Sequence, residues 1–319
     1  MTPGEKAQPL VDSVSAGLAE ALYTIASIFH GVRAPADEIT TLQLALYLRP
    51  DFPAAQFLLG NALDLKKSYM EAVKTYQHIL PVSPYFTPAQ IMIAYDNSEM
   101  GNTDFAFQIL DKLIASESAS LLPMIAKADI LRVRSEFSAA AVLYDEAIKR
   151  IKTRRKSDWL LYFSRGICLH RLGQLGRADE DMKKALEINP DNPDVLNYLG
   201  YSWLEAGKNL KEARKMVEKA YDARPEDPQI IDSMGYALYR DGDYDSAKEY
   251  FERALERMPD EPAVNEHLGD TYYKLGRKTE ARYQWQRALD SKPDDKAREM
   301  LQKKLENGLD AVSAQPAGK

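Results

Sequence analysis

Two consecutive stretches, PQIIDSMGYALYRDGDYDSAKEYFERALERMP (residues 228–259) and PAVNEHLGDTYYKLGRKTEARYQWQRALDSKP (residues 262–293), carry one pattern at one spacing. Each contains a glycine, Gly235 or Gly269, that is followed by alanine after 12 and 19 positions and by proline after 24. The two glycines are 34 residues apart. A fixed period of this length indicates a repeated supersecondary unit.

The small residue recurs along the whole chain. Its successive spacings are 34, 34, 34, 38, 34, 35 and 34 residues, and the position holds Ala26, Gly60, Ala94, Ala128, Gly166, Gly200, Gly235 and Gly269. The following alanine recurs at Ala72, Ala106, Ala140, Ala178, Ala213, Ala247 and Ala281. The first unit has Glu38 there and is therefore the least regular.

These positions predict that each unit is a pair of antiparallel helices. A small residue midway along the first helix lets the second helix come close. A bulky residue 16 positions later, such as Tyr76, Tyr144, Phe251 or Trp285, fills the space between neighbours. Proline then ends the second helix. One pair of helices cannot bury its apolar faces alone, so the units are expected to stack.

At these positions the chain resembles the tetratricopeptide repeat family, over about residues 10–293. The resemblance implies an all-α fold, a right-handed superhelical solenoid of about eight helix-turn-helix units plus a C-terminal capping helix. We expect a flexible lead at residues 1–9, a capping helix at 294–308 and a disordered tail at 309–319. The repeat units are expected near residues 19–50, 53–84, 87–118, 121–156, 159–190, 193–225, 228–259 and 262–293.

Two units depart from the period. The fourth lacks its closing proline and carries four extra residues near Lys149–Trp159, and the sixth has one extra residue around Lys208–Leu210. Both ends are expected to be capped. The apolar stripe predicted for the first helix is Val11, Val14, Leu18, Leu22, Ile25 and Phe29. The final helix is expected to cover the open end with Ala297, Met300, Leu301 and Leu305, to point Lys303 and Lys304 outward, and to stop at Gly308.

Charge and composition exclude several classes of protein. The net charge of -6 argues against general binding to nucleic acid or acidic membranes. Residues 1–120 hold 7 basic and 13 acidic residues, so this part is acidic and sparsely charged. No apolar run is long enough to span a bilayer, so no membrane insertion by this chain is expected. No export signal begins the chain, so a cytoplasmic location is the default, or a periplasmic or outer-membrane-attached one if an upstream signal is missing.

The sequence indicates no catalytic chemistry, metal or cofactor. The four histidines lie in different repeats, and Glu266, His267 and Asp270 are read as a polar patch. The single cysteine, Cys168, is expected to be a packed thiol. No phosphate-binding GxxxxGK[ST] loop is present. The repeats take up nearly the whole chain, which leaves no room for a catalytic domain. We therefore expect a protein that is not an enzyme.

The family resemblance also implies a binding surface. The first helix of each unit lines the concave face, and the residues expected to face it share set positions around the small residue. The predicted partner-binding residues are Asn61, Asp64, Tyr95, Asp129, Arg132, His170, Arg171, Asn197, Tyr201, Glu205, Asp232, Tyr236, Tyr239, Arg240, Asp270, Tyr273 and Lys274. Phe57, Glu99, Phe163 and Glu266 occupy matching positions. Tyrosine and arginine favour protein interfaces because they combine contact area with directional hydrogen bonds.

The placement of basic residues bears on two other kinds of contact. Family members that bind acidic chaperone tails use basic groove residues, but the corresponding positions here are Tyr23, Phe57, Ile91, Ile125, Phe163, Asn197, Asp232 and Glu266. None is basic, so that mode is not expected. The one basic cluster is Lys149, Arg150, Lys152, Arg154, Arg155 and Lys156. It is read as a solvated helix end, with a salt-sensitive contact to an acidic partner left open.

The final third, roughly residues 190–293, is similar to bacterial outer-membrane tetratricopeptide lipoproteins, some of which are adaptors for a carboxy-terminal processing protease. The residues that carry this are Leu196–Tyr201, Pro228–Arg240, Glu266–Asp270 and Tyr283–Trp285. The function expected is a non-catalytic scaffold or adaptor that binds a protein or peptide partner in the concave groove, with a protease adaptor as its refinement. Self-association is left open. The alternative is the repeat region of a larger enzyme, such as a glycosyltransferase, separated from its catalytic domain.

Overall fold

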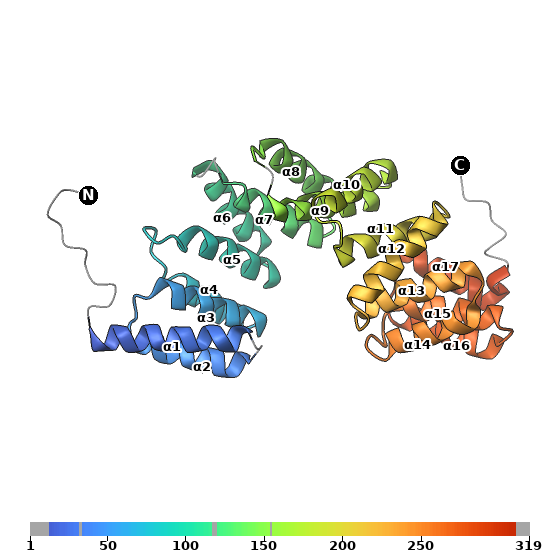
Figure 1. The fold of residues 1–319 in the computed structure, drawn as a ribbon, viewed down its shortest axis with the longest axis horizontal. Helices are drawn as coiled ribbons and strands as arrows, with labels where there is room; N and C mark the ends of the chain where they lie inside the picture. Colours follow the sequence, from blue (N-terminus) through green and yellow to red (C-terminus); the bar gives the residue numbers. More distant parts are fainter. Residues whose placement is uncertain (1–12, 32–33, 117–119, 154, 311–319) are drawn as a thin grey trace. The chain divides into compact units, whose positions relative to one another are not determined.

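The computed structural model describes residues 13–31, 34–116, 120–153 and 155–310. Within these ranges the chain is all-helical, with seventeen α-helices, one short 3-10 helix and no strand (Figure 1). The predicted all-α fold is therefore confirmed. The expected lead at residues 1–9 and most of the expected tail, residues 311–319, lie outside the described residues.

The chain forms two compact units. The first holds α1 (Val14–Gly31), α2 (Pro35–Leu48), α3 (Pro53–Leu65), α4 (Tyr69–Tyr76), α5 (Phe86–Glu99), α6 (Thr103–Ser116), α7 (Leu122–Val133) and α8 (Phe137–Arg150). The second holds η1 (Lys156–Asp158), α10 (Leu175–Ile188), α11 (Pro193–Glu205), α12 (Leu210–Ala223), α13 (Pro228–Asp241), α14 (Tyr244–Leu255), α15 (Pro262–Lys274), α16 (Lys278–Asp290) and α17 (Asp295–Asn307). Helix α9 (Trp159–Arg171) is divided between the two units. Residues 159–166 belong to the second unit and residues 167–171 to the first.

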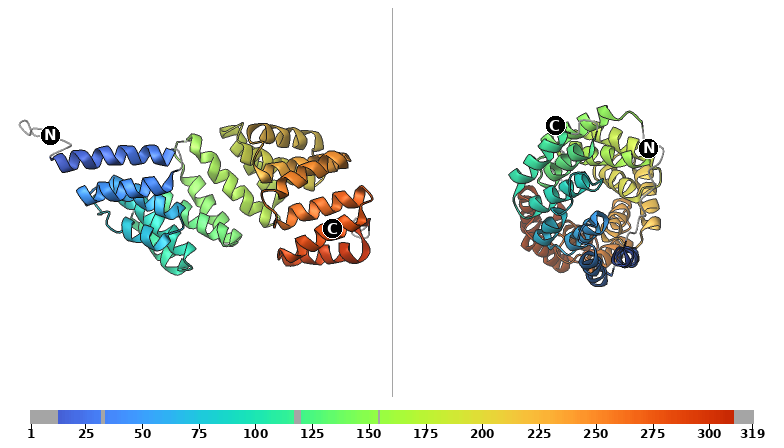
Figure 2. Two further views of the ribbon diagram at one scale, coloured as in Figure 1. Left: turned by 90° about the horizontal axis from the view of Figure 1, so that it is seen from below. Right: turned by 90° about the vertical axis from the view of Figure 1, so that its left-hand side faces the viewer.

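Each unit is a series of helix pairs, as the sequence predicts. The tightest contacts in the first unit join α1 to α2, α3 to α4, α5 to α6 and α7 to α8. In the second unit they join α11 to α12, α13 to α14 and α15 to α16, and α17 packs on α16. Consecutive helices lie side by side within each unit (Figure 2). First helices of neighbouring pairs also touch, as in α5 with α7 and α11 with α13.

The turn inside each pair has one conserved geometry. The residue seven positions after the small residue has a positive φ in six successive pairs from α3–α4 to α13–α14 and again after α15. Glycine occupies five of these seven turns, and it adopts this conformation without steric cost. Lys67 and Ser135, with φ of 60° and 63°, take the other two. The short turn therefore holds its shape even where the sequence does not supply glycine.

The small residue accepts a side chain of the second helix. A Cβ atom added at Gly235 would lie 2.8 Å from the Phe251 ring, and one added at Gly166 would lie 2.8 Å from the methyl carbon of Met182. The ring or aliphatic residue sixteen positions on is fully or almost fully buried at Tyr76, Leu110, Tyr144, Met182, Phe251 and Trp285. The predicted role of the small residue in close packing is therefore confirmed, and its contact is chiefly the bulky side chain of the partner helix.

The apolar stripe predicted for the first helix is wrong. Helix α1 instead buries Ala16, Ala19 and Ala26, while Val14 and Leu18 are exposed. Alanine suits this contact because α1 and α2 approach closely, so the larger side chains are pushed to the other faces. Ile25 is also exposed, Leu22 and Phe29 are half-buried, and Val11 lies outside the described residues.

The irregular first pair contains a buried polar contact. Glu38, in the slot that holds alanine elsewhere, is buried, and its carboxylate lies 2.9 Å from His30 Nδ1. A buried carboxylate needs such a partner because desolvation otherwise penalises its charge. In the fourth pair the extra residues form η1, where buried Asp158 accepts a hydrogen bond from the Arg155 amide at 2.8 Å.

Asp96 on α5 is the exception in the interior of the first unit. It has no exposed surface, and no N–H or hydroxyl group of the described residues donates to either of its carboxyl oxygens. Burial, then a hydrogen bond with the Asp64 side chain and the charges of Asp64 and Glu99, raise the pKa of Asp96 to about 8. Asp96 therefore carries a proton in the folded protein at neutral pH, because both desolvation and like charge disfavour the ionised form.

We expect Gly235→Leu to destabilise the second unit by about 1–3 kcal/mol through overpacking against Phe251. The measurement is the free energy of unfolding in urea, followed by circular dichroism. Gly176 in α10 has open space around it, so Gly176→Leu is the matched control and should leave stability unchanged or raise it. Equal losses for both variants would show that the glycine position does not set the packing.

Asp96→Asn should raise the unfolding free energy by about 1–3 kcal/mol at pH 7, because it removes an ionisable group that is fully buried beside the carboxylates of Asp64 and Glu99. The folded pKa, about 8, exceeds the ordinary 3.8, so wild-type stability should fall as the pH rises from 3.8 to about 8. The gain from the substitution should therefore be small at pH 4 and largest near pH 8. A gain that is independent of pH would contradict the raised pKa.

Candidate protein-binding face

The predicted partner-binding residues lie on the first helices of the pairs, and we call this surface the first-helix face. Most of them are half-buried, and a few, including Arg171, Glu205 and Lys274, are exposed. Asp232 is buried. Partial burial fixes a side chain by packing and leaves part of it open to solvent. The structure brings these residues together in two separate networks, one in each unit.

In the first unit, Asp129 on α7 is the centre of the network. Tyr95 on α5 donates to Asp129 Oδ2 at 3.3 Å, and Tyr144 on α8 donates to Asp129 Oδ1 at 2.6 Å. Arg132, one turn further along α7, places Nη2 3.5 Å from Asp129 Oδ1. Burial, followed by the charge and hydrogen bond of Asp129, raises the pKa of the Tyr95 hydroxyl. Three of the predicted residues, Tyr95, Asp129 and Arg132, therefore form one hydrogen-bonded group.

A rule links the residue after the small position to the buried ring fifteen positions later. Where that ring has a polar tip, it donates to the first helix: Tyr76 to Asn61 Oδ1 at 2.7 Å, Tyr144 to Asp129 Oδ1, and Trp285 Nε1 to Asp270 Oδ1 at 2.8 Å. A buried hydroxyl or indole N–H needs such an acceptor. Each of these acceptors, Asn61, Asp129 and Asp270, therefore stabilises its own helix pair through a hydrogen bond. Contact with a partner remains a prediction for them.

In the second unit an aromatic cluster joins three successive first helices. Tyr201 on α11 and Tyr236 on α13 have ring centroids 5.2 Å apart, and the Tyr236 ring lies 4.8 Å from that of His267 on α15. Tyr239 stacks beside Tyr236, with centroids 6.2 Å apart and planes inclined by 16°. Tyr201 Oη lies 3.4 Å from His267 Nε2. We call Tyr201, Tyr236, Tyr239 and His267 the tyrosine–histidine cluster.

His267 was not singled out as a site residue in the sequence, yet it organises this cluster. Its Nδ1 donates to Asp232 Oδ1 at 2.9 Å. Burial lowers the pKa of His267, but the carboxylates of Asp232, Glu266 and Asp270 outweigh burial and hold that pKa above its ordinary value. The signal that could have identified it is the 35-residue spacing from Asp232, which places the two on neighbouring first helices.

Lys304 contradicts the sequence expectation that it points outward. It is buried, and its Nζ lies 2.6 Å from Glu266 Oε1 and 2.7 Å from Asp270 Oδ2. A buried ammonium requires such partners, and two carboxylates on α15 supply them. Lys303, by contrast, is exposed and pairs with Glu299 on its own helix. Helix α17 is thus held by charge as well as by Leu301, which is fully buried as predicted.

The remaining predicted residues are dispersed. Arg240 donates to the carbonyls of Leu204 and Glu205 at the end of α11, and its guanidinium lies 6.0 Å from the Tyr236 ring. Tyr273 donates to Asp310 Oδ2 at 3.0 Å. Lys274 is 3.8 Å from Asp310. His170 and Arg171 lie together at the end of α9, and the buried Oδ1 of Asn197 has no hydrogen-bond partner.

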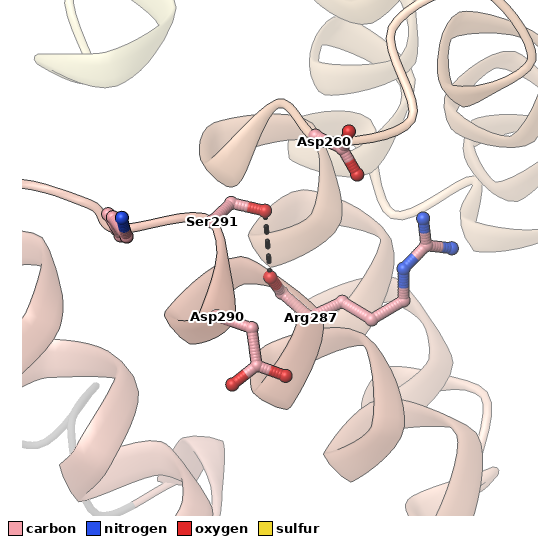
Figure 3. A pocket seen from close by; sticks show the side chains of 5 residues that line it. Asp260, Arg287, Asp290 and Ser291 are labelled. Carbon is pink, nitrogen blue, oxygen red and sulfur yellow. Dashed lines mark hydrogen bonds between the residues drawn. The ribbon is translucent and has the colours of Figure 1, made fainter.

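Two surface hollows lie away from these networks. One is polar and lined by Asp260, Arg287, Asp290, Ser291 and Lys292, with the Ser291 hydroxyl donating to the carbonyl of Arg287 (Figure 3). The other lies at the α5–α6 turn and includes Asn97 and Asp104. Both are shallow and without the convergent groups of a catalytic site. Within the described ranges, no three His, Cys, Asp or Glu side chains are arranged to hold a metal ion.

The basic cluster at the fourth pair stays a solvated surface in the part that is described. Lys149 and Arg150 end α8, and Arg150 pairs with Glu146 one turn earlier. Arg155 and Lys156 are exposed, and Arg154 lies outside the described residues. None of the helices in the described segments has both the length and the apolar character required to cross a lipid bilayer.

Comparison with known proteins identifies the repeat. Residues 159–192 and 233–296 match family models described as tetratricopeptide repeat. The TPR repeat-containing protein PA4667 of Pseudomonas aeruginosa is 30% identical over 198 residues, which cover 62% of this chain and 33% of that protein. The match thus spans about a third of that relative's length.

A solved structure above a TM-score of 0.5 agrees in fold. The APC/C heterotetramer Cut9–Hcn1 superimposes with a TM-score of 0.61 at 14% identity, covering 84% of this chain and 52% of that one. YrrB, a TPR protein with an unusual peptide-binding site, has a TM-score of 0.43 at 22% identity over 61% of this chain and 97% of that one. Together with the spacing of the helix pairs, the family matches show that this chain contains tetratricopeptide repeats.

Proposed function

We propose that this chain is a non-catalytic scaffold or adaptor that binds a segment of a partner protein on its first-helix face. The observation that carries the proposal is the tyrosine–histidine cluster, built from three successive first helices. Such a surface offers a continuous run of aromatic contact that no single helix pair could provide.

Pre-organisation is the physical reason that this cluster suits binding. Tyr236 is packed against Tyr201, Tyr239 and His267, so its ring is held in place before a partner arrives. Binding then costs less side-chain entropy than it would for a free tyrosine. Half-buried aromatic rings that keep a polar tip are the residues that most often dominate interface energies.

The charge around the cluster indicates which partners it disfavours. Asp232 and Glu266 lie at positions where chaperone-tail-binding relatives are expected to carry basic residues, and His267 and Lys304 respectively pair with them. An acidic segment would meet repulsion from Glu205, which is exposed. The proposal therefore excludes binding of acidic tails through a basic clamp.

The finer role as an adaptor for a processing protease belongs to the same proposal. It rests on the similarity of residues 190–293 to outer-membrane lipoproteins, and the tyrosine–histidine cluster lies within that segment. In this role the cluster would hold either the protease or its substrate.

The test is affinity capture from the native organism with wild-type protein and Tyr236→Ala/Tyr239→Ala. Loss of two central tyrosines should weaken binding by about 2 kcal/mol or more, and therefore reduce the captured partner at least tenfold. The control is Tyr47→Ala/Tyr283→Ala, which removes two tyrosines that are 83% and 63% exposed. Both variants should melt within a few degrees of wild type. Equal capture by all three proteins would contradict the proposed face.

A further inference from the structure

Helix α1 carries a stripe of apolar side chains that face solvent. The stripe consists of Val14, Leu18, Ala21, Ile25 and Ile28, and we call it the α1 seam. All five residues are exposed, and the four large ones are 83%, 53%, 44% and 62% accessible in chain order. A single exposed leucine is ordinary, but a contiguous apolar patch indicates a surface that another molecule covers.

The positions of the seam are buried in later first helices. The last three seam residues have counterparts 34 positions further on, at Ala55, Leu59 and Ala62 of α3, and all three are buried. These belong to one hydrophobic cluster with Leu42 of α2, the second helix of the preceding pair. The matching positions of α13 and α15 are also buried, at Ile230, Met234, Ala237, Val264, Leu268 and Thr271. On α1, which lies at one edge of the first unit, no described helix covers them (Figure 1).

The spacing of the seam is that of a helix–helix contact. Its residues are separated by four, three, four and three positions, an average of 3.5, which is the repeat of a coiled-coil seam. The face of α1 that packs on α2 is a different one, made by Ala16, Ala19 and Ala26. A further helix could therefore bind the seam without disturbing the first pair.

The order of residues in the seam makes it complementary to itself. Ala21 lies at the centre, Leu18 and Ile25 lie three and four positions away, and Val14 and Ile28 lie seven positions away on either side. Two such helices that run antiparallel and cross at Ala21 bring small residue to small residue and large residues to large ones. A two-fold symmetric contact requires a surface of this kind, because both copies present the same patch.

The charges of α1 also permit this contact. The acidic and basic side chains of the helix are Glu20 and His30. Glu20 accepts from Arg49 Nη1 at 2.9 Å, and His30 Nδ1 lies 2.9 Å from Glu38. Neither charge lies in the seam, so two copies can approach without burying an unpaired charge, which would be costly.

The opposite end of the described chain does not offer a matching surface. The exposed side of α17 carries charged residues, among them Lys296, Arg298, Glu299 and Lys303. A head-to-tail contact between α17 of one copy and α1 of the next would bury these charges against an apolar seam. The pairing of two α1 helices avoids that cost.

We propose that the α1 seam binds the α1 seam of a second copy of this chain, in a two-fold symmetric antiparallel contact. The contact continues the packing by which later first helices in one chain are covered. It goes beyond the proposed function, because the tyrosine–histidine cluster lies on α11, α13 and α15 and has no part in it. A dimer would carry two copies of the first-helix face.

The test is sedimentation equilibrium of the full-length chain over a wide range of concentrations. Three proteins are compared: wild type, Leu18→Glu/Ile25→Glu, and the control Met70→Glu/Phe105→Glu. The control residues lie on α4 and α6 and are 64% and 51% exposed, so the control removes similar apolar surface and adds the same charge.

Wild type and control should reach twice the chain mass of 36.0 kDa, and Leu18→Glu/Ile25→Glu should stay at 36.0 kDa. The dimer Kd of this variant should rise about a hundredfold or more, because each lost apolar contact occurs in both copies. Its circular dichroism spectrum should match that of wild type, since both side chains are exposed in the single chain.

Cross-linking of an otherwise unchanged seam gives a second readout. Ala21→Cys, treated with a short bis-maleimide linker, should form a covalent dimer, because the two copies cross at this residue. Glu71→Cys, at an exposed position on α4, should form none. The native Cys168 is buried and should not react.

Two results would overturn the inference. One is a wild type that is monomeric at every concentration, with no more cross-linking from Ala21→Cys than from Glu71→Cys. The other is a Leu18→Glu/Ile25→Glu variant that dimerises as tightly as the control, which would place the dimer contact on another surface. Neither result affects capture of a partner by the tyrosine–histidine cluster, so the proposed function is tested separately.

Discussion

The packing of a large second-helix side chain onto a small first-helix residue is the contact on which most of the helix pairs depend. Phe251 lies over Gly235 so closely that even a methyl group would have to displace it. Because the distance between the two helices is set by this contact, the direction of every other first-helix residue follows from it. A larger residue at the small position would therefore disturb the binding face as well as the core.

The same contact connects the core to the face. When the large residue is tyrosine or tryptophan, its polar tip reaches the side chain that follows the small residue, as Trp285 reaches Asp270. That side chain then accepts a hydrogen bond within its own helix pair. When the large residue is Phe251, which needs no acceptor, the following position is free to carry Tyr236 for the tyrosine–histidine cluster. Core composition thus decides which positions of the face are available to a partner.

Much of the fold could be predicted from the sequence because the period is enforced by sterics. A small residue, a bulky residue and a proline at set distances identify the helix pairs, and the α-helices lie where these positions place them. The first helix was misjudged because its stripe of Leu18 and Ile25 has the periodicity of a buried face, whereas the contact with α2 is made by alanines. Periodicity alone cannot distinguish two faces that are both apolar.

The site was less predictable because its features depend on contacts between repeats. Lys304 has the pattern of an exposed lysine, and only the position of α15 shows that two carboxylates bury it. Asp96 was not among the predicted residues, since it lies two positions after the small residue Ala94, outside the positions expected to face the groove. Its burial depends on the packing of α5 against its neighbouring helices, which no local sequence signal encodes.

The most direct test of a partner on the first-helix face is site-specific photocrosslinking in living cells. A benzophenone amino acid replaces Tyr239 on α13 in one strain and Tyr283 on α16 in another, since Tyr283 is a strongly exposed tyrosine on a second helix of the same unit. Irradiation should yield a discrete adduct with a second protein from position 239 and none from position 283. An adduct from position 283 alone would show that partners use the second helices, and that the tyrosine–histidine cluster serves only the fold.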